Sequence, residues 1–174
     1  MRRTLALAGS SVFFVAAPGV VAGLVPWWLT GWRVRAPLPF WGPLRAVGAM
    51  LVAAGAAVLI HAFVRFVTEG AGTPAPIAPT EHLVVGGLYR HVRNPMYLAV
   101  LAAILGQGLA LGQPRMFAYA GVVGVAFGAF VRWYEEPTLL RRFGEDYEAY
   151  RRAVRAWWPR LRPWQAGDRP RKGQ

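Results

Sequence analysis

Four long stretches without charged residues constrain the fold of this chain more than any other feature. Residues 4–32 contain no charge, 46–64 contain only His61 as an ionisable group, and 95–114 and 116–131 again contain none. About twenty apolar residues suffice for a helix to cross a bilayer. Charged residues make up only 16% of the chain, whereas soluble domains carry roughly a quarter. We therefore predict an all-α integral membrane protein with about four transmembrane helices.

The length of 174 residues indicates one domain, in which the third and fourth spans form a helical hairpin. The predicted parts are span 1 over 4–32, span 2 over 44–66, a cytoplasmic loop over 68–94, span 3 over 95–112, span 4 over 116–132, an interfacial helix over 137–158 and a flexible tail over 165–174. The part of the loop between 68 and 86 is rich in glycine and proline. This composition fits an ordered loop, a flexible lid or a linker.

The distribution of arginine predicts the orientation in the membrane. Four arginines, Arg33, Arg35, Arg45 and Arg115, fall in loops on one side, while the other 16 of the 20 basic residues and all eight acidic residues fall on the other. The positive-inside rule makes the second side, with both termini, cytoplasmic. The bias towards arginine over lysine hints at a GC-rich genome, so we expect a bacterial inner membrane. Alternatively, Arg2-Arg3 and the following apolar stretch form a cleavable signal peptide.

The region after Glu136 has the pattern of an amphipathic helix. Apolar residues recur at three- and four-residue intervals from Leu139 to Trp158, opposite a face rich in arginine and acidic residues. Pro137 suits a first helical turn, and Gly144 is a candidate break. A helix lying in the membrane interface is the expected structure.

Two polar clusters lie next to the third and fourth spans, one in residues 87–97 and the other at Glu135-Glu136. A hairpin with its turn at 112–115 would bring both clusters to the cytoplasmic face. Counting outward from the turn sets Asn94 level with Trp133 and His91 level with Glu136. Ionisable groups at the membrane boundary are expensive, so we expect a functional site.

These two motifs resemble those of a known family. Gly-Leu-Tyr-Arg-x-Val-Arg-Asn-Pro-Met-Tyr, followed by Glu-Glu-x-x-Leu-Leu-x-x-Phe-Gly-Glu-Asp-Tyr-x-x-Tyr, is similar to the integral-membrane methyltransferases related to isoprenylcysteine carboxyl methyltransferase and to phospholipid methyltransferases. The resemblance covers residues 68–160. Asn94 stands where members close to the eukaryotic enzyme usually have histidine, and Ala99 where a glycine is common. Asparagine retains hydrogen bonding but lacks imidazole basicity.

The resemblance implies that S-adenosylmethionine binds at the cytoplasmic ends of these helices and that a methyl group passes to a lipophilic acceptor. An isoprenylcysteine carboxylate is the leading acceptor, and a phospholipid amine or a small thiol is the alternative. A non-enzymatic membrane scaffold is the alternative from another class. The oligomeric state is left open, and no nucleic-acid partner is expected because the basic residues bracket apolar spans.

The chemistry of the cofactor explains the residue types. Its carboxylate suits free amide groups at a helix start such as Asn94-Pro95, and its ammonium and ribose hydroxyls suit Glu135 or Glu136. Its sulfonium suits aromatic faces, for which Tyr89, Tyr97, Trp133 and Tyr134 are candidates. The predicted cofactor-binding residues are Tyr89, Arg90, His91, Asn94, Pro95, Tyr97, Glu135 and Glu136.

The predicted catalytic residues are Arg93, Arg132 and Glu136. An arginine would hold a carboxylate acceptor, whereas a carboxylate such as Glu136 would deprotonate an ammonium acceptor, so both acceptors stay open. His61 and Arg65 share a helix face near the cytoplasmic end, where they either reach the acceptor or serve structure. No metal site is expected, since the histidines at 61, 82 and 91 lack ligand spacing. The glycines of spans 3 and 4, at 106, 108, 121, 124 and 128, are assigned to close helix packing.

Overall fold

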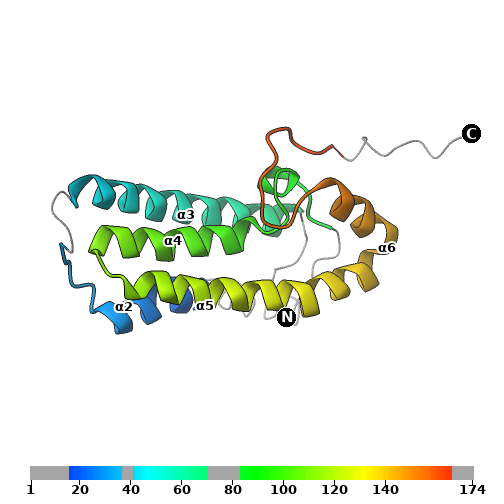
Figure 1. Cartoon of the computed structure of the whole chain (residues 1–174). Coiled ribbons are helices and arrows are strands. Elements are labelled where there is room, and N and C mark those ends of the chain that lie inside the picture. Colours follow the sequence, from blue (N-terminus) through cyan, green and yellow to red (C-terminus); the bar gives the residue numbers. More distant parts are fainter. Residues whose placement is uncertain (1–15, 37–40, 70–82, 166–174) are drawn as a thin grey trace, which may run out of the picture.

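The computed structural model describes residues 16–36, 41–69 and 83–165, and this part of the chain is helical without a strand. The elements in chain order are η1 (Val20–Leu24), α2 (Val25–Thr30), α3 (Gly42–Glu69), η2 (Gly87–Arg90), α4 (Pro95–Leu111), α5 (Arg115–Phe130), η3 (Val131–Glu135) and α6 (Glu136–Ala153). In Figure 1, α3 and α4 lie side by side, α5 runs next to α4 and continues into α6, and α2 lies beside α5.

Two helices among the described residues are long and apolar enough to cross a membrane. They span Gly42–Arg65 and Arg115–Ala153, while Ala16–Thr30 and Pro95–Leu111 are shorter apolar helices. The prediction of an all-helical protein is confirmed for the described residues. The predicted count of four spans is not confirmed, since two of the described helices pass as candidate spans. The first half of predicted span 1, the greater part of the 68–86 loop with Glu81 and His82, and nearly all of the tail lie outside the described residues.

Glycines allow α3 and α4 to pack almost backbone against backbone. A Cβ atom on Gly106 would lie 2.6 Å from the carbonyl oxygen of Gly48, and one on Gly55 would lie 2.7 Å from that of Ala99. Small residues let membrane helices approach closely. The two helices run antiparallel, since Gly48 meets Gly106 while Gly55 meets Ala99.

The glycines of α5 behave differently from the prediction. Side chains added at Gly121 or Gly128 would meet nothing within 4 Å in the described part of the chain, and one at Gly124 would only reach Leu101 at 3.8 Å. The expected close packing is therefore found for Gly106 and Gly108 of α4, whereas these three glycines make no close helix contact there. Helical spacing alone could not tell a packed glycine face from an open one.

Two polar side chains, one in α4 and one in α5, donate hydrogen bonds to a π-helical turn near the start of the described chain. Gln107 in the middle of α4 donates to the carbonyl of Ala22 at 2.7 Å, and Tyr119 of α5 donates to that of Val21 at 2.8 Å. Both acceptors belong to η1, a π-helical turn. Because π-turns shift the backbone hydrogen bonds of a helix, they leave carbonyl oxygens open to other donors.

The helix α6 differs from its predicted extent. It is broken at Gly144, which has φ +50° and ψ −123°, as the candidate break suggested, but it ends at Ala153 and not at Trp158. Val154 is extended, and residues 154–164 turn back over the start of α4. We call residues 154–164 the strap. The strap lies at one end of the bundle, in orange to red in Figure 1, and covers residues 87–94, which we call the motif segment.

Candidate active site at the motif segment

Backbone hydrogen bonds fasten the strap to the motif segment. The amide of Arg93 donates to the carbonyl of Arg155 at 3.0 Å, the amide of Arg160 donates to that of His91 at 2.9 Å, and the amide of Trp164 donates to that of Arg90 at 3.0 Å. Such pairing satisfies backbone groups of a segment that has little regular structure of its own. The strap and the motif segment therefore form one unit above the start of α4.

Side chains of the motif segment reinforce this unit. Arg90 donates through Nε to the carbonyl of Trp164 at 2.6 Å, and Nδ1 of His91 lies 2.8 Å from the carbonyl oxygen of Arg160. Asn94 is the N-cap of α4, followed by Pro95 at the first helical position, as predicted. Its side chain does not cap the helix, however, because Nδ2 donates to the carbonyl of Ala156 at 3.2 Å.

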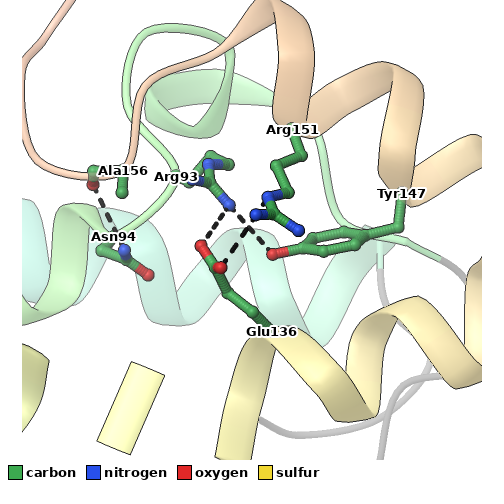
Figure 2. A network of polar contacts seen from close by, with 6 residues as sticks. All are labelled: Arg93, Asn94, Glu136, Tyr147, Arg151 and Ala156. Carbon is green, nitrogen blue, oxygen red and sulfur yellow. Dashed lines mark hydrogen bonds and ion pairs between the residues drawn. The ribbon is translucent and has the colours of Figure 1, made fainter. Parts of the chain in front are cut away.

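A buried ion pair joins the motif segment to the start of α6 (Figure 2). Arg93 donates through Nη1 to Oε1 of Glu136 at 2.7 Å and to the hydroxyl of Tyr147 at 3.0 Å. Nε of Arg151 lies 3.8 Å from the other carboxylate oxygen. The side chains of Arg93 and Glu136 are only 11% and 10% exposed, so the pair is largely desolvated.

One polar atom of this network has no partner. Nε of Arg93 is buried and makes no hydrogen bond among the described residues. Such an unsatisfied donor costs about 1–3 kcal/mol, or more for a charged group. Buried polar groups are otherwise nearly always paired, so this atom marks a position where an anionic ligand would be stabilised.

The second carboxylate of the motif is held separately. Tyr97 on the first turn of α4 donates through its hydroxyl to Oε2 of Glu135 at 2.8 Å. Its ring lies 4.6 Å from that of Phe127 and 6.3 Å from that of Trp157, measured between centroids. Within the described part of the chain, the other oxygen of Glu135 makes no hydrogen bond or ion pair. A carboxylate with one open oxygen thus lies beside a group of aromatic rings.

Tyr89 is buried behind these carboxylates. It packs with Ala62 of α3 and Met96 of α4, and its carbonyl accepts a 2.6 Å hydrogen bond from the hydroxyl of Tyr150. Burial raises the pKa of the Tyr89 phenol well above its usual range, and the nearby Glu135 carboxylate raises it further. The phenol therefore stays neutral and does not act as a base.

The expected meeting of the two motifs occurs, but in a different register. Arg93, and not His91, faces Glu136, and Tyr97 faces Glu135. Two features differ from a uniform α-helical hairpin. The π-helical turn η3 between α5 and α6 rotates Glu135 and Glu136, and α4 begins only at Pro95, so His91 and Arg93 do not continue that helix. Counting residues from the turn assumed such a uniform helix.

Three predicted residues do not join the cluster. Arg132 is exposed and makes no hydrogen bond or ion pair with it among the residues described, and Trp133 and Tyr134 are 78% and 49% exposed. Their side chains are exposed at the surface of η3. Their surroundings resemble those of anchors at the membrane interface, where tryptophan and arginine are enriched.

Conversely, sequence reasoning missed Tyr147, Arg151 and the strap as neighbours of the motif. Tyr147 and Arg151 are four residues apart in α6, so they lie on one face of the helix, where Tyr147 contacts Arg93 and Arg151 contacts Glu136. The four-residue spacing is visible in the sequence. The predicted amphipathic pattern, however, places Tyr147 on the apolar face of the helix and Arg151 on the charged face.

Comparison with known proteins agrees with this arrangement. The family model described as "Phospholipid methyltransferase" matches residues 44–146, which include most of α3, all of α4 and α5, the motif segment and Glu135-Glu136. The chain belongs to the phospholipid methyltransferase family. The predicted relation to membrane methyltransferases is thereby confirmed, and the match to phospholipid enzymes fits the alternative acceptor better than the isoprenylcysteine carboxylate.

Two fungal proteins, both named phosphatidylethanolamine N-methyltransferase, are similar over part of this chain. The protein of Pyrenophora tritici-repentis is 28% identical over 68 residues, covering 39% of this chain and 8% of its own length. The protein of Phaeosphaeria nodorum is 30% identical over 71 residues, covering 41% of this chain and 8% of its own length. This chain therefore spans only a small part of these curated relatives. No solved structure matches it.

Proposed function

We propose that this protein is an S-adenosylmethionine-dependent methyltransferase that methylates the amine of an ethanolamine phospholipid. The observation that carries the proposal is the carboxylate pair at the junction of η3 and α6, with Glu136 held by two arginines and Glu135 open on one oxygen. The names of the fungal relatives support the choice of a phospholipid amine.

The residues present fit the methyl donor. Its carboxylate would be held by the buried Nε of Arg93, which has no partner among the described residues. Its sulfonium would be held by the rings around Tyr97. When bound, S-adenosylmethionine supplies an electrophilic methyl group on a sulfonium.

Glu135 is the better candidate for the base that acts on an amine acceptor, and Glu136 for a positioning residue. Glu136 already has Arg93 on one oxygen and Arg151 near the other, so it orients Arg93. Glu135 accepts one hydrogen bond from Tyr97 and can accept the proton that the ammonium of the acceptor loses. The neutral amine then has the free electron pair that methyl transfer requires.

Enclosure of the site is the other contribution expected from the chain. The strap covers the motif segment, and the ring of Tyr97, whose hydroxyl holds Glu135, is flanked by the rings of Phe127 and Trp157. Excluding water strengthens the electrostatic interactions in the site, and side chains held in place align the reacting groups. We further propose a single membrane domain with four spans, in which this site and both termini face the cytoplasm.

Two measurements on the purified protein in lipid nanodiscs test the proposal. Calorimetry with S-adenosylhomocysteine tests the donor site, and mass spectrometry after incubation with methyl-labelled donor identifies the acceptor. We expect saturable binding and label on phosphatidylethanolamine in preference to an isoprenylcysteine or a small thiol. An absence of both binding and label would favour the membrane scaffold, and label on an isoprenylcysteine carboxylate alone would restore the first prediction.

A further inference from the structure

The strap is buried at its two ends and open in between. Val154 and Trp164 are 1% and 9% exposed, and they belong to one buried cluster with residues of α6. Trp158 and Leu161, in contrast, are 74% and 98% exposed, and no other large hydrophobic residue of the described chain is as exposed as Leu161. The part of the chain that the structure describes therefore leaves these two apolar side chains largely uncovered.

The exposed part of the strap also carries positive charge. The strap contains three arginines and no acidic residue. Arg160 is used within the protein, where its Nη1 donates to the carbonyl of Ala153 at 2.9 Å. Arg155 and Arg162 are exposed, and neither side chain makes a hydrogen bond or ion pair with the rest of the described chain. In the sequence, these two arginines flank the two exposed apolar residues.

Prolines and a backbone hydrogen bond hold this surface in a fixed shape. Pro159 and Pro163 fix their own φ angles and restrict the residues before them. Between the two prolines, the amide of Arg160 donates to the carbonyl of His91 at 2.9 Å. A surface that is already ordered loses little conformational entropy when it binds a partner. The strap is therefore a preformed binding surface.

The position of the strap decides which partner fits this surface. The strap covers the motif segment, which contacts α3, and α3 is a candidate membrane span (Figure 1). The end of a spanning helix lies at the bilayer boundary, where tryptophan and arginine are enriched. Apolar side chains enter the headgroup region there, and arginines are attracted to the anionic lipids of the cytoplasmic leaflet. An anionic lipid surface is thus adjacent and matches both the charge and the apolar side chains.

The strap is also connected directly to the residues of the candidate site. The carbonyl of Arg155 accepts a hydrogen bond from the amide of Arg93 at 3.0 Å. The ring of Trp157 lies 6.3 Å from that of Tyr97, measured between centroids, and the hydroxyl of Tyr97 holds Glu135. Because these contacts and the exposed side chains belong to one short segment, fixing the strap also fixes Arg93 and Tyr97.

We infer that the strap binds an anionic phospholipid surface through Arg155, Trp158, Leu161 and Arg162, and that this contact keeps the site arranged for methyl transfer. The binding surface stands on the exposed residues of the strap. Its effect on the rate rests on the proposed function. It follows that methyl transfer should be faster in a membrane that contains anionic lipid than in a neutral membrane.

A label on the strap tests the lipid contact without any turnover. The chain contains no cysteine, so Leu161→Cys can carry an apolar fluorescent label in the full-length protein. The labelled protein is compared in nanodiscs of phosphatidylcholine with and without phosphatidylglycerol. Quenching by spin-labelled lipid reports contact with the bilayer, and quenching by acrylamide reports exposure to water. We expect the anionic nanodiscs to raise the first and lower the second. Equal quenching in both nanodiscs would overturn the inference.

The double variant Arg155→Gln with Arg162→Gln tests the role of charge in the same assay. Its matched control is Arg141→Gln with Arg152→Gln, which removes two exposed arginines of α6 that already have side-chain partners within the helix. One arginine strengthens binding to an anionic surface by about fivefold. We therefore expect the strap variant to weaken the contact by about 25-fold and the control to retain it. Equal effects of the two double variants would overturn the inference.

Rates of methyl transfer in the same nanodiscs, with equal amounts of phosphatidylethanolamine, test the consequence for the site. We expect phosphatidylglycerol to accelerate the wild type and to have no effect on the strap variant. The strap variant should match the wild type in neutral nanodiscs, which shows that it is folded.

The two assays separate this inference from the proposed function. If the label responds to phosphatidylglycerol but the wild type methylates no amine, the proposed function fails while the lipid-binding surface stands. If the wild type methylates phosphatidylethanolamine at the same rate in both nanodiscs, the inferred effect of the strap on the site fails while the proposed function stands.

Discussion

The two ends of the α3–α4 pair satisfy their polar groups in opposite ways. At the end near the α4–α5 turn, neutral side chains donate to backbone carbonyls: Gln113 to Arg33 at 2.6 Å and Trp41 to Leu109 at 2.8 Å. At the other end, Arg93 and Glu136 form a buried ion pair, and Nε of Arg93 lacks a partner among the described residues. Neutral hydrogen bonds are enough to close a helical hairpin. The charged end therefore carries costs that folding alone does not require.

The largest difference between the two ends should appear when one member of the ion pair is removed. We expect Glu136→Leu to lower the free energy of unfolding by about 3–5 kcal/mol, because it leaves the Arg93 guanidinium buried without its counterion. The double variant Arg93→Met with Glu136→Leu should regain most of this loss and stay inactive. Thermal unfolding in detergent, monitored by circular dichroism, measures both. A double variant less stable than the single one would contradict this account of the pair.

Disturbing the tight packing of α3 against α4, which lies between the two ends, should give the next largest loss of stability. Gly106→Val would place side-chain atoms against the backbone of α3, where a Cβ atom already lies 2.6 Å from the carbonyl oxygen of Gly48. Overpacking of this kind costs about 1–3 kcal/mol. The control is Gly121→Ala in α5, which we expect to be neutral or slightly stabilising in the same unfolding measurement. Equal losses of stability in both variants would contradict the close contact of Gly106 with α3.

Removing the break in α6 should change stability by at most as much as the packing at Gly106 does. Gly144→Ala forces a side chain into φ +50° and ψ −123°, which costs about 1–3 kcal/mol. If the helix straightens to relieve this strain, Tyr147 moves away from Arg93 and Arg151 moves away from Glu136. We therefore expect the rate of methyl transfer to fall even if the loss of stability is small. Ala149→Gly in the same helix is a control for a simple change in helix propensity. A rate unchanged in Gly144→Ala would show that the break does not serve the site.

The smallest effect is expected for Arg132. Because its side chain is exposed and makes no hydrogen bond or ion pair with the cluster among the described residues, Arg132→Gln should leave the rate of methyl transfer within about threefold of wild type, a change below 1 kcal/mol. Steady-state kinetics with saturating donor and lipid measure it. A loss as large as that of a Glu136 variant would return Arg132 to the catalytic residues that the sequence predicted.

The helical hairpin and the meeting of its two motifs could be predicted from the sequence because they follow from hydropathy and a single turn. Gly112 is left-handed with φ +63° at the end of α4, where the predicted turn begins. The register of the motifs could not be predicted, because η3 depends on tertiary packing that residue spacing does not reveal. The strap was missed for a similar reason. Its Trp158 fits the apolar stripe by spacing yet is 74% exposed, because the helix has already ended at Ala153.

The central claim is that the carboxylates where η3 meets α6 perform the reaction. Its most direct test is the rate of label transfer to phosphatidylethanolamine by the wild type and by Glu135→Gln, with the affinity for S-adenosylhomocysteine measured on the same samples. We predict a rate reduced by about 100-fold or more, as expected for loss of a general base, and an affinity close to that of the wild type. An unchanged rate in Glu135→Gln would contradict the claim.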